Sequence, residues 1–215
     1  MPSVENANLD LEKFESFTEK GKGKIAEICR IAAQVFSEKG YLKTSLADVA
    51  HAVGITKGGI FHYFSTKEEL LFLIIFRHLD EALYNMKSKL DTCDSNQDKI
   101  SVFIRHHINN YRDNQAESRL ALHERGNLPE KYLGTIKEKE REYVGILRSI
   151  IEKLIKEQKK NAPNATLITY SLLGMLTWPY AWFNPKGSST PEELSEIIYK
   201  IFFGELKIQQ PRKHK

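Results

Sequence analysis

The stretch from Thr44 to Lys67, TSLADVAHAVGITKGGIFHYFSTK, constrains the fold more than any other part of the chain. It predicts two short helices joined by a tight turn at Gly54, because small residues on either side of the turn let the helices cross closely. Its apolar positions are placed to pack this pair onto the preceding helix; they are Val49, Ile55, Ile60 and Phe64. From these residues alone, a helix-turn-helix and a generic three-helix bundle with a glycine turn are about equally good interpretations.

The rest of the chain has the same helical periodicity. Apolar residues recur at steps of three and four, which is typical of amphipathic helices. Besides the two short helices, the pattern predicts helices over residues 22–39, 67–89, 97–113, 117–125, 130–160, 165–183 and 191–206. No segment shows a convincing strand pattern, so we expect an all-α protein.

Positive charge is concentrated in one segment. Eight basic and three acidic residues lie between Lys20 and Lys67, hence +5, whereas the whole chain carries +4. Such a concentration favours a polyanionic partner. The longest apolar run, Leu70 to Phe76, is far too short to span a membrane, and the N-terminus lacks the features of a secretory signal. We therefore expect a cytoplasmic protein with no membrane partner. Cys29 lies in an apolar helical pattern and is expected in the core.

If the stretch is a helix-turn-helix, its second helix enters the major groove of DNA. Lys57 can reach base acceptors or phosphate, and Tyr63 and His62 can donate hydrogen bonds to phosphate oxygens. Gly58 and Gly59 each cost roughly 1 kcal/mol of helix stability relative to alanine, which suggests close approach of the backbone to DNA. The residues expected to contact DNA are Thr44, Thr56, Lys57, Gly58, Gly59, Phe61, His62, Tyr63 and Lys67, with Thr44 and Lys67 gripping phosphate beside helix N-termini.

The segment from Ile25 to Leu71 resembles the N-terminal domain of TetR-family transcriptional regulators in order and spacing. The resemblance rests on AAQVFSEKGYLKTSLADVA, GITKGGIFHYF and STKEELL. It implies a homodimer whose two recognition helices enter successive major grooves, about 34–36 Å apart, on a palindromic double-stranded operator. It favours the helix-turn-helix over the generic bundle.

The resemblance also implies a division into domains. We expect a flexible arm over residues 1–19, a DNA-binding domain over 20–66, a helical effector-binding and dimerisation domain over 67–208, and a basic tail over 209–215. In TetR-like proteins the last two long helices pair with those of a second copy, and the helix over 165–183 is apolar nearly all round. The expected dimer residues are Ile168, Leu172, Met175, Leu176, Leu194, Ile197, Ile198, Ile201 and Phe202. Plain intramolecular packing is the alternative for this set.

The run TWPYAWFNPKGSSTPEEL resembles the branch of the family that responds to acyl-CoA thioesters, among regulators of fatty-acid, steroid-ring and aromatic-acid degradation. This implies a small hydrophobic effector, an acyl-CoA, whose binding releases DNA. The residues expected to bind it are Phe103, His107, Tyr111, Leu120, His123, Trp178 and Trp182. The two tryptophans could instead only pack a dimer interface, and the histidines could be solvated or satisfied core residues.

Two other functions are kept open: a TetR-type sensor of another hydrophobic compound, such as a drug or free fatty acid, and a helical enzyme acting on an acyl-CoA or similar ligand. The chain shows no nucleophile elbow, phosphate-cradling glycine loop, metal-ligand spacing or evident carboxylate pair, which argues against an enzyme. We expect no catalytic residues, no metal and no cofactor. The sequence leaves open the operator, the effector and whether the protein represses or activates.

Overall fold

A computed structural model describes residues 10–157 and 164–204. Every regular element in these ranges is a helix, which confirms the all-α prediction. The chain forms two compact units. Unit 1 comprises the chain up to Asn85 together with Asn114–Tyr143, and unit 2 comprises Met86–Asp113 together with the chain from Val144. None of the helices in the described ranges is long and apolar enough to cross a bilayer.

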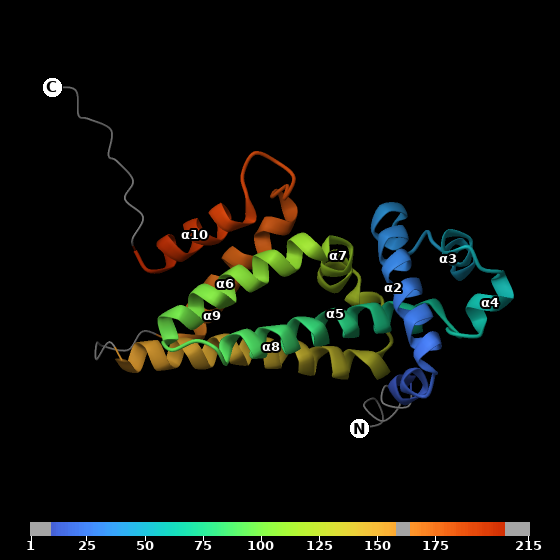
Figure 1. Cartoon of the computed structure of the whole chain (residues 1–215), viewed down its shortest axis with the longest axis horizontal. Helices are drawn as coiled ribbons and strands as arrows, with labels where there is room; N and C mark the ends of the chain where they lie inside the picture. Colours follow the sequence, from blue (N-terminus) through green and yellow to red (C-terminus); the bar gives the residue numbers. More distant parts are fainter. Residues whose placement is uncertain (1–9, 158–163, 205–215) are drawn as a thin grey trace. The chain divides into compact units, whose positions relative to one another are not determined.

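Unit 1 is built around the helix α2, Glu19–Lys39, which packs against α3, Leu46–Val53, and α7, Gln115–His123 (Figure 1). The unit also contains α4, Lys57–Phe61, a short 3-10 helix over Arg125–Asn127, and the first parts of α5, Lys67–Leu90, and α8, Glu130–Glu157. Thr18 caps the start of α2 by accepting a hydrogen bond from the backbone N–H of Gly21. The predicted bounds of α2 and α5 agree with the observed helices to within three residues.

The core of unit 1 joins these helices through fully buried apolar side chains. Ile28 of α2, Val49 of α3, Ile60 of α4 and Leu70 of α5 are each 0% exposed. Cys29 lies in the same core, as predicted, and its burial raises the pKa of its thiol to about 12. The three helices of the N-terminal domain are therefore held by one continuous apolar cluster.

The N-terminal segment differs from the prediction. Residues 10–15 are helical and Phe14 is buried against Phe64, with ring centroids 5.4 Å apart. Residues 10–15 therefore do not have the unstructured backbone expected of a flexible arm over residues 1–19, whereas residues 1–9 lie outside the described part. Leu11, Phe14 and Phe17 do have the three-residue spacing of one helical face. The pattern is short and lies among polar residues, so it is hard to recognise in the sequence.

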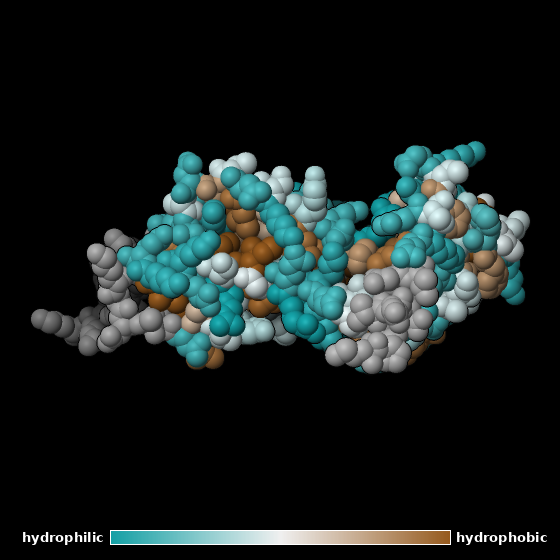
Figure 2. Space-filling model, turned by 90° about the horizontal axis from the view of Figure 1, so that it is seen from below, coloured by the Kyte–Doolittle hydropathy of each residue, from teal (hydrophilic) through white to brown (hydrophobic). Residues whose placement is uncertain are grey.

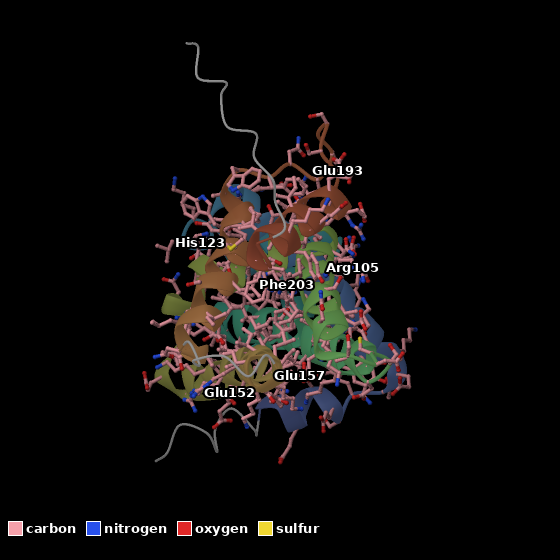
Figure 3. All side chains as sticks on the ribbon, turned by 90° about the vertical axis from the view of Figure 1, so that its left-hand side faces the viewer. Arg105, His123, Glu152, Glu157, Glu193 and Phe203 are labelled. Atoms are coloured by element: carbon pink, nitrogen blue, oxygen red, sulfur yellow. The ribbon has the colours of Figure 1, made fainter. Side chains whose placement is uncertain are left out.

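Unit 2 contains α6, Asn96–Asp113, α9, Ala165–Thr177, the 3-10 helix η2, Trp178–Ala181, and α10, Pro191–Phe202. α10 packs along α6. The two helices are also joined by a hydrogen bond of 2.7 Å from Gln97 to the hydroxyl of Tyr199. Figure 3 marks Glu193 near the start of α10 and Phe203 at its C-cap.

Three expected helices have different ends. The helix expected over 165–183 leaves the α-conformation after Thr177, because Pro179 lacks the N–H that an α-helix needs and η2 takes its place. The helix expected to reach residue 206 ends at Phe202, and the second short helix, expected to reach Phe64, ends at Phe61. The last residues of the helix expected over 130–160 lie partly outside the described ranges.

Candidate nucleic-acid interface

The turn between α3 and α4 depends on Gly54. Gly54 has φ 75° and ψ 29°, the left-handed conformation, and its N–H donates to the carbonyls of Ala50 and His51. At the other end of α3, Ser45 and Asp48 form a reciprocal capping box. Both ends of this short helix are therefore closed by local hydrogen bonds, which fixes where α4 begins.

One side of α4 faces the core and the other faces solvent. Ile60 and the following Phe64 are both 0% exposed, which anchors the helix on unit 1. The side chains of Thr56, Lys57, Phe61 and His62 are exposed, Phe61 with 49% of its surface. Tyr63 and Gly59 are half-buried. The side of α4 expected to face DNA is thus presented outward.

The two glycines of α4 have different surroundings. A Cβ atom on Gly59 would lie 3.2 Å from Oγ1 of Thr56, the oxygen that accepts the Gly59 N–H and caps the helix. A Cβ on Gly58 would meet no atom within 4 Å. The fold therefore explains the small residue at 59, whereas no contact within residues 10–157 and 164–204 requires a glycine at 58.

Two residues expected to grip phosphate are engaged within the protein. Thr44 is only 3% exposed and its hydroxyl donates to the carbonyl of Gly40, so its predicted DNA contact is not supported. The ammonium of Lys67 donates to the carbonyls of Tyr41 and Thr44, both at 3.0 Å, and lies 4.3 Å from the Tyr41 ring centre. Lys67 therefore closes the turn between α2 and α3. The sequence shows its charge but not these carbonyl partners.

Sequence reasoning missed an aromatic contact to the exposed helix. Phe17 precedes α2 and stacks on Tyr63, with ring centroids 5.7 Å apart and planes inclined by 27°. Its ring also meets His62 edge-on at 5.8 Å. Two residues expected to contact DNA thus rest on a side chain from the segment that was expected to be a mobile arm.

The residues expected to bind an effector fall in both units. Phe103, His107 and Tyr111 follow one another at four-residue steps on α6 in unit 2, and Phe103 is fully buried. The hydroxyl of Tyr111 donates to the carbonyl of Tyr180 in η2, between the exposed Trp178 and Trp182. The remaining two expected residues belong to α7 of unit 1; these are Leu120, which is buried in the core, and His123, which is exposed.

The expected dimer residues divide into buried and exposed sets. The buried set consists of Leu172, Leu176, Leu194 and Ile198, which are at most 9% exposed within a single chain. These four are buried within unit 2, which favours the alternative of plain intramolecular packing for them. Ile168, Met175 and Phe202 are half-buried, and Ile197 and Ile201 are each 47% exposed.

The outer face of α9 and η2 carries apolar residues that the prediction did not include. Leu167 is 67% exposed and Tyr170 61%, and Trp178, expected only as an effector residue, is 63% exposed. On an α-helix, positions 167, 170, 174 and 178 share one side. The face of the molecule drawn in Figure 2 likewise shows hydrophobic residues gathered in separate patches within a mostly hydrophilic surface.

The basic segment between Lys20 and Lys67, with its outward-facing short helix after a glycine turn, is typical of a helix-turn-helix DNA-binding protein. Comparison with family profiles agrees with this interpretation. Residues 28–74 match the bacterial regulatory proteins of the tetR family, and residues 93–206 match the tetracyclin repressor-like C-terminal domain. The chain belongs to the TetR family of transcriptional regulators, a class of protein that is not normally enzymatic.

Individual relatives share the family at low identity. The transcriptional repressor KstR2 of Mycolicibacterium smegmatis is 21% identical over 192 residues, which cover 87% of this chain and 93% of KstR2. The uncharacterized regulator YfiR of Bacillus subtilis is 43% identical over 58 residues, 27% of this chain and 28% of YfiR. A structure of AibR in complex with isovaleryl coenzyme A and operator DNA matches with TM-score 0.76 and 26% identity, covering 83% of this chain and 97% of AibR.

Proposed function

We propose that this protein is a ligand-responsive transcriptional repressor that binds a palindromic operator as a homodimer and is released by a small hydrophobic effector, an acyl-CoA. The observation that carries the proposal is the exposure of Thr56, Lys57, Phe61 and His62 on the outer side of α4. The backbone at Gly58 supports it, since a glycine that the fold does not require is explained by close approach of DNA.

DNA binding is tested with duplexes selected from a random-sequence pool. Binding to the selected duplex should weaken steeply with salt, because each neutralised phosphate contributes about 0.9 to the slope of log affinity against log salt. Replacing Lys57 with alanine should weaken binding by about tenfold. Lys153, exposed on α8, provides the control, since Lys153→Ala should leave affinity unchanged. Failure to select any duplex, or equal affinity in both variants, would refute the DNA-binding role of α4.

Gly58 permits a second test of the same interface. Gly58→Ala should raise the free energy of unfolding by up to about 1 kcal/mol, because alanine favours helix and meets no neighbour here. The same change should weaken DNA binding, because the added methyl group stands where the duplex backbone approaches. A more stable variant with unchanged affinity would show that DNA does not approach this position closely.

The dimer is proposed to form through the outer faces of α9 and α10. Large apolar side chains exposed on these helices include Leu167, Tyr170, Trp178, Ile197 and Ile201. Several large apolar side chains exposed on neighbouring helices favour an interaction site. Sedimentation analysis should show a dimer that dissociates when Ile197 and Ile201 are both replaced with glutamate. Leu122→Glu, at a residue that is 42% exposed on α7, is the matched control and should remain dimeric.

The effector is proposed from the pattern around Trp178 and Trp182 and from the likeness to AibR, whose solved complex contains isovaleryl coenzyme A. A ligand that binds the native state raises the melting temperature. Isovaleryl coenzyme A and longer thioesters should therefore raise it more than their free acids and should release the selected duplex. Equal shifts from acid and thioester would favour the alternative of a sensor for another hydrophobic compound.

A further inference from the structure

Residues 10–17, which we call the N-terminal bracket, contact both the start of α8 and the residues that directly follow α4. One carboxylate oxygen of Asp10 accepts hydrogen bonds from the hydroxyl of Tyr132 at 2.6 Å and from the ammonium of Lys131 at 2.9 Å. Tyr132 is itself fixed, because its ring stacks on Phe72 of α5 with centroids 4.2 Å apart and planes inclined by 11°. The first end of the bracket is thus attached to a rigid part of unit 1.

The middle of the bracket is attached to the start of α5. The ammonium of Lys13 lies 2.6 Å from Oε1 of Glu69, a carboxylate whose side chain is only 4% exposed. The other oxygen of Glu69 accepts the N–H of Ser65, in the loop that follows the recognition helix. The adjacent Phe14 is buried and packs on Phe64. Removal of the Lys13 ammonium would leave the buried Glu69 carboxylate without its ion pair in a poorly hydrated site.

The second end of the bracket reaches the residues proposed to contact DNA. Phe17 stacks on Tyr63 and meets His62 edge-on, as described above. The ring lies close to the backbone of α2 at Gly21, where a Cβ would lie 3.0 Å from Cδ1 of Phe17, so a larger residue at position 21 would push the ring aside. Phe17 therefore packs against one face of the Tyr63 ring and restricts the position of that ring.

We propose that the N-terminal bracket positions His62 and Tyr63 for operator binding, and that the contact of Asp10 with Lys131 and Tyr132 holds the bracket in place. The bracket acts through His62 and Tyr63 without touching DNA. This inference rests on the proposed function of α4 as a DNA-reading helix. It adds a determinant of affinity that lies outside the helix-turn-helix and includes two residues of α8.

The first test removes the charge of Asp10 and distinguishes a positioning role from a purely electrostatic effect. Asp10→Asn makes the protein more positive, so simple electrostatics would strengthen DNA binding. The proposed role of the bracket predicts the opposite: affinity for the selected duplex should fall by about three- to tenfold. This is the size of effect expected when one aromatic contact is lost. Glu15→Gln is the matched control, since Glu15 lies exposed in the same segment and loses the same charge. It should bind DNA as well as, or slightly better than, the natural chain.

A double-mutant cycle tests the contact itself. Phe17→Leu keeps an apolar side chain but removes the ring, and it should weaken binding by about three- to tenfold. In a Tyr63→Ala, His62→Ala background the same change should have almost no further effect, because the side chains that Phe17 positions are gone. Equal losses in both backgrounds would overturn the proposal, as would Asp10→Asn binding like Glu15→Gln.

A measurement without DNA separates this inference from the proposed function. In the free protein, the ring-proton resonances of His62 should move in Phe17→Leu and in Asp10→Asn, and stay in place in Glu15→Gln. Unchanged His62 resonances in the first two variants would refute the bracket whatever the protein binds. If the resonances move but no duplex is ever selected, the bracket stands and the DNA-binding proposal fails.

Discussion

Gly54→Ala is the sharpest test of how the chain builds the turn between α3 and α4. At φ 75° and ψ 29° an L-residue with a side chain brings its Cβ close to the carbonyl oxygen, which costs roughly 1–2 kcal/mol relative to a right-handed conformation. A Cβ at this position meets no other atom within 4 Å, so steric crowding adds nothing to that value. We therefore expect the free energy of unfolding to fall by about 1–2 kcal/mol.

The assay is urea unfolding followed by circular dichroism at one fixed protein concentration. Gly54→Asn should lose less than Gly54→Ala, since asparagine tolerates the left-handed region better than alanine does. Gly58→Ala is the matched control, because Gly58 is also surrounded by open space but has an ordinary helical backbone. The reasoning would be refuted if Gly54→Ala were as stable as the natural chain, or if both alanine variants changed stability in the same direction.

Three further predictions concern other parts of the molecule. Burial lowers the pKa of His78 to about 4, and its ring lies 3.2 Å from the hydroxyl of Ser118. The unfolded chain binds this proton near pH 6.5, so the contribution of neutral His78 to the free energy of unfolding should be fully present above that pH and should fall by at most about 3 kcal/mol as the pH drops to 4. His78→Gln should reduce the pH dependence of urea midpoints measured across this range. An unchanged pH dependence would contradict the assignment. Lys67→Met should lower the free energy of unfolding by about 1–3 kcal/mol, because two carbonyls of the α2–α3 turn lose their donor. Urea unfolding measures this change. An unchanged free energy of unfolding would show that water replaces the ammonium as the donor to these carbonyls. Thr190→Ala should lower the free energy of unfolding by about 1 kcal/mol in thermal or urea unfolding, because it removes the capping box of α10. Ser189→Ala is the control, and equal stability of the two variants would argue against the cap.

The helices were predictable where caps and periodicity agree. Gly40 and Gly54 end α2 and α3 at the expected places, since both adopt a positive φ that few other residues tolerate. The outward face of α4 was also predictable, because Ile60 and Phe64 are the apolar positions that must point inward. Lys67 was not, since charge alone suggested a phosphate contact and only the folded turn reveals the carbonyls it binds.

The proposed dimer face shows a different limit of sequence reasoning. α9 is apolar nearly all round, so periodicity could not separate its inner residues, such as Leu172, from its outer ones, such as Leu167. The N-terminal bracket was missed for the opposite reason, because three aromatic and aliphatic residues among polar ones form too short a pattern to stand out. Its ion pairs join positions about 60 and 120 residues apart, which no local pattern contains.

The environment of Cys29 makes the natural chain convenient for site-specific fluorophore attachment. Cys29 is buried and its thiol has a pKa raised to about 12, so almost none of it is present at pH 8 as the reactive thiolate. Cys93 follows α5 and is partly accessible, and these two are the only cysteines of the sequence. A maleimide dye should therefore attach to Cys93 alone, so that duplex and thioester titrations can be followed optically without engineering the protein.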